Sequence, residues 1–566
     1  MTHIENDILI IGAGGAGMYA ALAAARDGAS VTLVDRALIG RGGATVMAQM
    51  TVAAAMGDEC PDSWEHHLAD TLAAGRGLCD PALSQLLCEQ GPHRIREMDA
   101  WKAGWARRDG GKTGPLKQVM APGHDRPRCV YVDFLNTGPA VSKTLRTQLN
   151  RLAAVRRLGD VMVTDIVVRD GEAVGAAGFH LATGAPVTLA ARAVIIATGG
   201  LTRLYRRNSA SVNMSGDGYA LALRAGAELV DMEFVQFFPI GHLAPRLIGM
   251  DPIMWDPFRY KLGGRLTNAK GEELGDRYGN TESGKYVLTR DIATWAITKE
   301  VEAGRGSPSG GAWLSFRHLP EAELRRAFGP VIDRLKKNGI DLTKQDVEVA
   351  PIAHYHMGGV RVNERMETRV PNLYCSGEAV GGANGANRLS GNAITEALVF
   401  GERAGASAAA LSRRRTGTGW SDAAAAPALE RLRAAARPRI NTAAMVVALQ
   451  DTMADDVGPF RTAEKLQRAL ATIDGMTREL GDLPPAADPH YSMERLDWFD
   501  LRNMLLVAKI VARTALARRE SRGAHQREDF PGMLPEWQLN QVVSMQGDTI
   551  NLTQLPVPGA APRVAA

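Results

Sequence analysis

The N-terminal hydrophobic pattern predicts a strand, a tight turn, a helix and a second strand. The segment ILIIGAGGAGMYAALAAA, residues 8–25, carries no charged side chain over about the length that a lipid bilayer needs. It opens with an aliphatic run, continues through glycines and ends rich in alanine, and a second aliphatic run, SVTLVD, follows soon after. The preceding THIEND lacks the basic residues of a secretory signal. The pattern therefore favours strand–turn–helix–strand, and we expect no transmembrane or targeting segment.

The last third of the chain shows the periodicity of amphipathic helices. Around ALERLRAAARPRI, TAEKLQRALATIDGM and LDWFDLRNMLLVAKIVARTALARRES, apolar residues recur at helical spacing. The loop SRRRTGTGWSDAAAAPA precedes them, and its alanine run predicts a helix start. We predict three or more helices over residues 413–530, a loosely structured tail over 531–566, and no internal repeat.

The glycine spacing near the N-terminus is typical of a dinucleotide-binding turn. Gly12, Gly14 and Gly17 form a G-x-G-x-x-G pattern between strand and helix, and Asp35 closes the next strand. In this context Gly12 makes the tight turn, Gly14 lets the backbone approach a pyrophosphate, and Gly17 packs the helix on the strand. The free N–H groups at the helix N-terminus attract phosphate, and Asp35 would accept hydrogen bonds from a ribose.

Two later segments repeat an aliphatic strand followed by glycines. ARAVIIATGG covers residues 191–200, and residues 370–405 read as strand, acidic residue, glycine-rich loop and helix. FAD is long, and its isoalloxazine end needs a loop and a helix N-terminus of its own. The three fragments therefore predict one FAD-binding domain that is interrupted by another domain.

Composition narrows the class of protein. The chain has 566 residues, of which 45% are hydrophobic and 23% are charged, as in a soluble protein of several globular domains. The net charge of +4 arises from 66 basic and 62 acidic residues spread along the chain, so we expect no nucleic-acid partner. Five cysteines without a C-x-x-C pair favour a reducing, cytoplasmic compartment and argue against an iron–sulfur cluster in this chain.

Two histidines, His354 and His356, stand close together in the stretch APIAHYHMGG. On a strand both imidazoles would point to one face, as the ligands of a metal site do. Two ligands alone do not make a metal site, so metal binding, catalysis and packing all stay open at this point.

Seven motifs follow one another in a recognisable order. After the glycine fingerprint they are TVMAQMTVAAAMG, NMSGDGYALALRAGAELVDMEFVQFFP, LTRDIATWAI, HYHMGG, GANRLSGNA and SRGAHQREDFP. In this order the chain resembles the flavoprotein subunits of succinate dehydrogenase and fumarate reductase, with L-aspartate oxidase and adenylylsulfate reductase as relatives. The resemblance runs over residues 8–531.

The resemblance implies an α/β fold in which a Rossmann-like FAD-binding domain is interrupted by an α+β capping domain and followed by a C-terminal helical domain. We place the FAD-binding domain at 1–236 and 352–412 and the capping domain at 237–351. The helical domain then covers 413–530 and the tail 531–566.

The resemblance also implies hydride transfer between flavin N5 and a carbon of a saturated or unsaturated acid, which the family holds between the FAD-binding and capping domains. It assigns carboxylate binding to His354 and Arg388 and proton transfer to Arg290. A guanidinium holds a carboxylate through two parallel hydrogen bonds. Arginine normally keeps its proton, so its role as an acid depends on the resemblance alone. The implied FAD contacts are Gly12, Gly14, Gly17, Asp35, Thr45, Gln49, Thr198, Gly199, Asp217, Glu378, Arg388 and Asn392.

Ala44 marks a first departure from the family. Succinate dehydrogenases attach FAD covalently through a histidine just before T-V-x-A-Q, and this chain has Ala44 at that place in RGGATVMAQ. We therefore expect FAD to be bound noncovalently, as in aspartate oxidase. The missing bond slightly disfavours succinate oxidation and is compatible with reduction.

A second departure concerns the far end of the substrate. The family's QFHPTG is QFFPIG here, so Phe238 and Ile240 replace a histidine and a threonine that help to hold one carboxylate. A carboxylate without partners against these apolar side chains would be costly. We expect a substrate whose second end is apolar, aromatic or differently placed. Aromatic residues of the nearby MDPIMWDPFRY are Trp255, Phe258 and Tyr260.

His356 takes the place where the family usually has asparagine or threonine. We expect a local backbone hydrogen bond, or a contact to flavin or substrate, and no metal. We group it with Phe238, Ile240 and Trp255 as the predicted substrate pocket, which leaves His354 as the substrate ligand of the pair.

Leu262 is a third departure. It stands in RYKLGG where the family often has the glutamate of R-G-E-G-G, which feeds the proton relay. The proton path must then differ, or run through Arg259, Lys261 or water.

A flavin that accepts two electrons must pass them on, and this chain has no second redox centre. The resemblance favours a separate iron–sulfur subunit, with a soluble acceptor or oxygen as the alternative, and a location in the cytoplasm or at the inner face of a membrane through partners. Within the family, amine oxidation or a sulfur substrate is the rival activity. From another class, a non-catalytic flavin electron-transfer subunit is the rival.

Overall fold

The computed structural model describes residues 2–133, 135–247, 250, 252–255, 262–278, 290–435, 440–486 and 491–559, and for Arg290 and Asp291 the backbone only. The chain divides into two compact units. Unit 1 comprises Met1–Arg206, Ala210–Val235 and Tyr355–Ala566, and unit 2 comprises Arg207–Ser209 and Gln236–His354.

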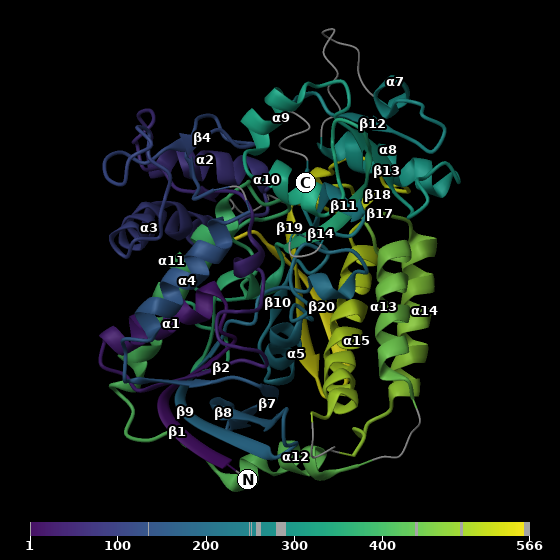
Figure 1. Cartoon of the computed structure of the whole chain (residues 1–566). Helices are drawn as coiled ribbons and strands as arrows, with labels where there is room; N and C mark the ends of the chain where they lie inside the picture. Colours follow the sequence, from purple (N-terminus) through teal and green to yellow (C-terminus); the bar gives the residue numbers. More distant parts are fainter. Residues whose placement is uncertain are drawn as a thin grey trace. The chain divides into compact units, whose positions relative to one another are not determined.

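A seven-stranded sheet forms the centre of unit 1 (Figure 1). Its order is β6-β2-β1-β9-β8-β7, and β16 also pairs with β9. The strands β6, β2, β1, β9 and β16 run parallel, whereas β8 pairs antiparallel with β9 and β7. The bounds are β1 Thr2–Ile11, β2 Val31–Val34, β6 Val155–Leu158, β7 Val161–Arg169, β8 Glu172–His180, β9 Pro186–Ile196 and β16 Leu373–Cys375. Parallel strands need crossover segments, which is why the sheet draws on three separate parts of the chain.

Helix α1 (Gly15–Arg26) packs closely against α11 (Asn392–Ser412), although the sequence separates them widely. Gly401 and Gly405 of α11 make this approach possible, because a Cβ on either would collide with a backbone carbonyl of α1. The alanine-rich face of α1 is buried almost completely. Small residues on both helices therefore bring the first and third sequence fragments together.

Unit 1 contains further helices and short strands before α11. They are η1 Thr45–Met47, β3 Val52–Ala53, α2 Trp64–Ala74, α3 Pro81–Ala100, β4 Gln118–Val119, β5 Cys129–Val130, α4 Thr137–Leu149, η2 Thr202–Leu204, α5 Asp217–Arg224, β10 Leu229–Val230, β15 Gly359–Val360 and η3 Gly377–Ala379.

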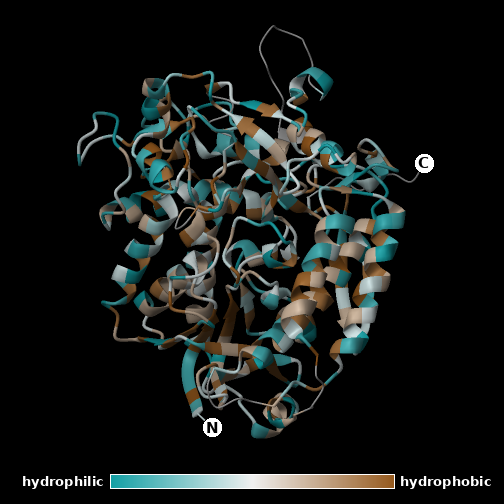
Figure 2. Cartoon of the chain, turned by 45° about the vertical axis from the view of Figure 1, so that its right-hand side comes forward, coloured by the Kyte–Doolittle hydropathy of each residue, from teal (hydrophilic) through white to brown (hydrophobic). Residues whose placement is uncertain are grey.

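The C-terminal part of unit 1 contains the predicted helices, which are α12 Asp422–Arg433, α13 Thr442–Asp456, α14 Ala463–Leu480 and α15 Met493–Ala517. Helices α13, α14 and α15 lie side by side in Figure 1, whereas α12 packs against β7 and β8. In Figure 2 these helices mix brown and teal residues, as amphipathic helices do. The long α15 also packs against α5. No helix within the described ranges is long and apolar enough to cross a bilayer.

The segment expected as a loose tail, 531–566, instead contains regular structure. After β17 (Phe460–Arg461) pairs with β18 (Gln526–Arg527), the chain forms η4 (Pro535–Trp537) and the hairpin of β19 (Leu539–Gln546) and β20 (Thr549–Pro556). β19 pairs with β10 of the N-terminal half. Four consecutive residues of β19, Asn540 to Val543, are buried, and because the apolar residues of LNQVVSMQ do not alternate, the sequence shows no strand pattern here.

Unit 2 has its own four-stranded sheet in the order β11-β14-β13-β12. Its strands are β11 Val235–Ala244, β12 Arg265–Thr267, β13 Ala312–Ser315 and β14 Val347–His356, and its helices are α7 Leu274–Tyr278, α8 Arg290–Glu302, α9 Glu321–Phe328 and α10 Val331–Lys337. The short stretch 207–209 joins this unit because its backbone pairs with Ala353. A mixed α/β chain with a C-terminal helical region confirms the predicted fold class.

Candidate functional site

The glycine turn after β1 has the geometry that a dinucleotide cradle needs. Gly12 has a φ of +103°, and a Cβ on it would collide with the carbonyl of Ala197. A Cβ on Gly17 would collide with the carbonyl of Gly12. In contrast, nothing in the chain lies within 4 Å of a Cβ placed on Gly14. The fold itself therefore requires Gly12 and Gly17, whereas only a ligand would require Gly14.

Asp35, directly after β2, receives two backbone hydrogen bonds. Its Oδ2 accepts from the N–H of Ala13 at 2.7 Å and its Oδ1 from that of Ala37 at 2.8 Å. Burial raises the pKa of Asp35, and these two bonds oppose the rise. Each carboxylate oxygen keeps a second lone pair that can accept a hydroxyl, so Asp35 ties the glycine turn to the next strand and can still bind a ribose.

Three parallel neighbours, β1, β9 and β16, end at the same level of the sheet, because Ile11 aligns with Ile196 and Ile196 with Cys375. Ligands of open parallel sheets bind beyond the carboxyl ends of the strands. There the hydroxyls of Thr198 and Ser376 are buried and have no hydrogen-bond partner in the described part of the chain. Buried hydroxyls usually find a partner, which makes both candidates for a ligand contact.

Gly199 follows Thr198 with a φ of +74° and faces the side chain of Met214. Because a side chain rarely adopts this φ, the glycine lets the chain turn at the end of β9.

Thr45 and Gln49 lie on and just after η1. Thr45 Oγ1 accepts a hydrogen bond from the N–H of Gly15 at 3.2 Å, which fixes η1 beside the start of α1. The Gln49 side chain is buried, and its backbone carbonyl accepts from the N–H of Leu135. Ala44 precedes η1, and its methyl side chain has no atom that could form a bond to a flavin.

Asp217, the first residue of α5, belongs to a buried charge network. Its carboxylate lies 3.3 Å from the guanidinium of Arg36, which also pairs with Asp500 of α15. Arg203 pairs with the other oxygen of Asp500. Burial raises the pKa of Asp217, whereas Arg36 lowers it. The sequence pattern pointed to Asp217 without its partners, and the signal for Arg36 was only its place directly after Asp35.

Glu378 lies in η3 and is almost completely buried. Its Oε1 accepts the backbone N–H of His356 at 3.2 Å. Burial raises its pKa to about 8, so the neutral acid predominates at pH 7 and can donate a hydrogen bond. This places a proton donor next to the end of β16, where the sequence predicted an FAD contact.

Arg388 lies in the glycine-rich loop before α11 and is 8% exposed. Its guanidinium carbon stands 4.4 Å from the ring centre of Tyr355, a cation–π contact. The Tyr355 hydroxyl donates to Glu396 at 2.6 Å, and Asn384 donates to the same carboxylate oxygen at 2.6 Å. Burial raises the pKa of Glu396 to about 7. Glu396 and Asn384 thus fix the ring of Tyr355, and that ring holds the guanidinium of Arg388 in a defined position.

Asn392 has a structural set of contacts. Its Oδ1 lies 2.8 Å from His67 Nε2, and its Nδ2 donates to Thr71 Oγ1 at 3.2 Å. Its side chain is completely buried. The amide that the sequence predicted as an FAD contact therefore fixes the start of α11 to α2, and no sequence pattern singled out either His67 or Thr71.

Within unit 2, His354 lies on β14. Its Nδ1 is 2.7 Å from Ser209 Oγ, and its ring packs edge-on against Phe238 with 5.6 Å between centres. Phe238 also packs against Met254 and Ile352. The imidazole is thus oriented by one hydroxyl and one aromatic ring.

Two other predicted pocket residues of unit 2 are completely buried. Ile240 is 0% exposed. Trp255 is also 0% exposed, donates its indole N–H to His242 Nδ1 at 3.1 Å and packs against Phe316 and Phe328. These contacts favour a place for both in the core of unit 2. Phe258 and Tyr260 lie outside the described residues, as do Arg259 and Lys261.

The contacts of His356 argue against a role as a metal ligand. Its Nδ1 lies 3.0 Å from the Tyr219 hydroxyl and its Nε2 3.1 Å from the carbonyl of Met232. Burial lowers its pKa to about 4, which keeps the ring neutral. Both ring nitrogens therefore have hydrogen-bond partners within the protein, which favours a structural role, and its predicted place in the substrate pocket stays a prediction. In the described part of the chain, no three His, Cys, Asp or Glu side chains cluster as metal ligands.

Arg290 is the first residue of α8, and its side chain lies outside the described structure. Its proposed role in proton transfer therefore stays a prediction. Leu262 lies just before β12, and its aliphatic side chain has no group that could relay a proton.

Two family models match the chain. The model of the FAD binding domain matches residues 7–394, and the model of the fumarate reductase flavoprotein C-terminal region matches residues 447–558. The chain belongs to the fumarate reductase and succinate dehydrogenase flavoprotein family. It is an FAD-dependent oxidoreductase, as the resemblance implied.

Similar proteins extend over nearly the whole flavoprotein. One subunit of the fumarate reductase (CoM/CoB) of Methanothermobacter marburgensis is 35% identical over 94% of this chain and 96% of its own. L-aspartate oxidase of Streptomyces coelicolor is 33% identical over 93% of this chain and 89% of its own. The solved structure of Mycobacterium smegmatis Sdh1 in complex with UQ1 has a TM-score of 0.90 and 32% identity, and the match covers 100% of this chain and 96% of that one.

The residues of the flavoprotein fit FAD. Gly14 leaves room for a pyrophosphate at the N-terminus of α1, whose first N–H groups have no partner within the helix. Asp35 can bind the ribose, and the two buried hydroxyls of Thr198 and Ser376 lie where a ligand of the sheet would pass. The sequence pattern did not reveal Ser376, because a serine after a strand carries no signal until strand ends are aligned.

Proposed function

We propose that this flavoprotein reduces, or forms, a carbon–carbon double bond beside a carboxylate, on a substrate other than plain succinate. The observation that carries the proposal is Arg388. A guanidinium that stands 4.4 Å from the ring centre of Tyr355, whose hydroxyl is in turn held by Glu396, is preorganised for a planar anion. FAD, when bound, supplies hydride exchange at N5.

The first proposed role is binding of the substrate carboxylate. Arg388 binds it through two parallel hydrogen bonds, and the motif order assigns carboxylate binding also to His354, whose ring is oriented by Ser209. Withdrawal of electron density toward this clamp makes the β-carbon of a conjugated alkene a hydride acceptor. Arg290 would then deliver a proton to the neighbouring carbon, a role that rests on the motif order alone.

The substrate class follows from unit 2. Phe238 and Ile240 offer no hydrogen bond to a second carboxylate, and Phe238 lies directly against His354. Burial of a charged group without partners costs several kcal/mol. We therefore propose a monocarboxylate whose other end is apolar or aromatic.

We propose that FAD is bound without a covalent link, because the alanine methyl of Ala44 offers no nucleophile. Precipitation with acid tests this directly: the flavin should stay in the supernatant. A yellow pellet would contradict the proposal.

We also propose an electron partner that carries iron–sulfur clusters. Relatives are named as subunits, among them the Methanothermobacter marburgensis relative and the Escherichia coli fumarate reductase flavoprotein subunit. The five cysteines of this chain are free and scattered, and four of them are buried. A cytoplasmic location, if need be at a membrane through partners, stays a prediction from the sequence.

Amine oxidation is the second candidate, favoured by the 33% identity to an L-aspartate oxidase. Mixing with oxygen and amino acids separates the two activities, since an oxidase releases peroxide and a reductase of this type needs an added electron donor.

The decisive experiment is anaerobic. The purified flavoprotein is reduced, and a series of unsaturated mono- and dicarboxylates is tested for return of the oxidised flavin spectrum. We expect monocarboxylates with an apolar substituent to reoxidise the flavin faster than fumarate does. If no acid reoxidises it and Arg290→Ala changes nothing, the proposed activity fails.

A further inference from the structure

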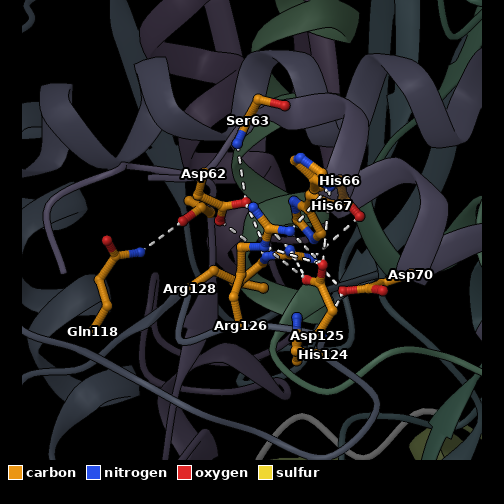
Figure 3. Close-up of polar contacts among 12 residues, drawn as sticks. Asp62, Ser63, His66, His67, Asp70, Gln118, His124, Asp125, Arg126 and Arg128 are labelled. Carbon is orange, nitrogen blue, oxygen red and sulfur yellow. Dashed lines mark hydrogen bonds and ion pairs between the residues drawn. The ribbon is translucent and has the colours of Figure 1, made fainter. Parts of the chain in front are cut away.

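A buried arginine organises a polar cluster in unit 1 (Figure 3). Arg128, which is 0% exposed, lies just before β5 and pairs with three carboxylates. The distances are 3.1 Å to Asp62, 2.6 Å to Asp70 and 2.6 Å to Asp125. A buried guanidinium with three anionic partners is strongly anchored, because the loss of any partner would leave buried charge. It fixes the segment 124–128 to the start of α2.

Two histidines of this cluster reach the loop that carries Arg388. His124 Nε2 lies 2.7 Å from the carbonyl oxygen of Ser390, and His67 Nε2 lies 2.8 Å from Asn392 Oδ1. A carbonyl oxygen can only accept, so both imidazoles must donate from Nε2. This leaves Nδ1 of each ring as a bare acceptor, buried and without a partner in the described part of the chain.

Both rings are kept neutral by their surroundings. Burial is the main cause that lowers the pKa of each, to about 3 for His67, and the nearby Arg128 lowers it further. Cys129 Sγ also lies 3.6 Å from His124 Nε2, but burial raises the pKa of that thiol to about 12. The pair is therefore a neutral thiol beside a neutral imidazole, and not a nucleophilic cysteine.

The contacts converge on a short stretch of backbone. Between the ties at Ser390 and Asn392, the carbonyl of Gly391 accepts from the N–H of Ala53 at 3.0 Å. Arg388 itself donates to the carbonyl of Leu389 at 3.2 Å. Residues 388–392 are thus held from outside at three successive positions, although a glycine with φ of +88° lies among them.

We propose that His124 is a positioning residue for Arg388: its Nε2–H, anchored through the Arg128 cluster, holds the Ser390 carbonyl and so fixes the loop that presents the guanidinium. The inference rests on the proposed function in one respect, since it takes Arg388 as the carboxylate ligand. His67 supplies the second tie on the same loop.

The test compares two substitutions at one position. His124→Gln places an amide donor at a similar reach, whereas His124→Phe keeps a ring of similar size without a donor. His93→Gln, at an exposed histidine on α3, is the matched control. Each variant is studied as the FAD-loaded protein, first by hydrogen–deuterium exchange of peptides covering residues 386–395 and then by steady-state kinetics. The kinetic probes are cinnamate and fumarate, with reduced methyl viologen as electron donor.

We expect His124→Phe to speed exchange in 386–395 and to raise KM for the accepted probe about 10- to 100-fold, with a smaller change in kcat. His124→Gln should stay within about threefold of the parent protein, since it restores the donor. His93→Gln should change neither measurement.

Several results would overturn the inference. Unchanged exchange in His124→Phe would show that the bond holds nothing, and equal effects of the phenylalanine and glutamine variants would show that the donor is irrelevant. Faster exchange with an unchanged KM would show that the position of this loop does not control substrate binding by Arg388. If the parent protein accepts neither probe, that failure belongs to the proposed function, and the exchange measurement alone decides the role of His124.

Discussion

The loop before α11 in unit 1 and the strands β11 and β14 in unit 2 differ in the polar partners that surround their candidate ligand residue. Around Arg388, the side chains of Tyr355 and Glu396 take part in a defined ring contact and a defined hydrogen bond. The imidazole of His354 contacts the hydroxyl of Ser209 and packs against Phe238, which belongs to an apolar cluster. In the proposed function, the first region keeps the arginine of the family's motif for one carboxylate, whereas the second has apolar residues at Phe238 and Ile240 where the family has a histidine and a threonine.

This difference separates reaction type from substrate choice. A guanidinium that is already oriented can bind one carboxylate whatever the rest of the molecule is. Apolar side chains cannot compensate the lost hydration of a second carboxylate, and they stabilise an apolar group instead. Substitutions in each region can therefore test the binding of the first carboxylate and the choice of substrate separately.

The largest effect is expected at Arg388. Arg388→Ala should lower kcat/KM for the accepted acid about 1000-fold, or about 4 kcal/mol of transition-state stabilisation, because the planar two-point contact is lost. Arg388→Lys should recover little of it, since an ammonium is a point charge. Retained flavin absorbance is the control, and an activity within about tenfold of the parent would contradict the clamp.

Gly14→Ala should weaken FAD binding about 10- to 100-fold and leave the flavin-free fold intact, because no protein atom lies within 4 Å of the added methyl group. Equilibrium dialysis and thermal unfolding measure the two quantities. Gly475→Ala, in the middle of α14 with equal room, should leave FAD binding unchanged. A flavin affinity equal to that of the parent protein would show that the pyrophosphate does not bind at this turn.

Restoring the family residues in unit 2 should move the preference between substrates. Phe238→His with Ile240→Thr should raise the ratio of kcat/KM for fumarate to that for an aromatic monocarboxylate about 10-fold, since two hydrogen-bonding groups return. Phe237→His lies on the opposite face of β11 and serves as the control. If the ratio stays constant while circular dichroism shows a folded protein, these two positions do not select the substrate.

Glu396 should make stability depend on pH. Its pKa is about 7 in the folded protein because burial opposes ionisation, and about 4.3 in the unfolded chain. The folded state therefore binds the proton more tightly, and stability is lost as pH rises from about 4.3 to about 7, by about 4 kcal/mol in total, of which about 2 kcal/mol falls above pH 5.5. Urea unfolding at pH 5.5 and 8.5 should show a smaller loss in Glu396→Gln. Glu402→Gln on the same helix should retain the full loss, and equal losses in both variants would contradict the assignment.

The smallest effect on catalysis is expected at His356. His356→Thr removes the contacts to Tyr219 and Met232 and leaves a small cavity, so the free energy of unfolding should fall by about 2 kcal/mol. Activity should stay within about twofold. A large change in KM at unchanged stability would return His356 to the substrate pocket.

The sequence predicted local chemistry better than packing. Gly12, Gly17 and Asp35 could be read directly, because a tight turn and a strand end constrain residue type within a few positions. His67, His124 and Arg128 could not be predicted from the sequence. Each has a partner more than fifty residues away in the chain, and no sequence motif indicates such a contact. The only local hint was the charged stretch GHDRPR.

The pattern of apolar and glycine residues predicted an interrupted FAD-binding domain and C-terminal helices, from a glycine turn between two aliphatic runs, two further strand–glycine fragments and an amphipathic C-terminal third. Motif order added the family, since backbone turns and anion contacts restrict the residues that can serve them. Only the tertiary structure decided which polar residue faces which partner. It gave Asn392, His356 and Trp255 hydrogen-bond partners within the protein and formed a hairpin in the expected tail. The reason is physical: side-chain burial and pairing depend on contacts between distant segments, and a linear pattern contains no distances.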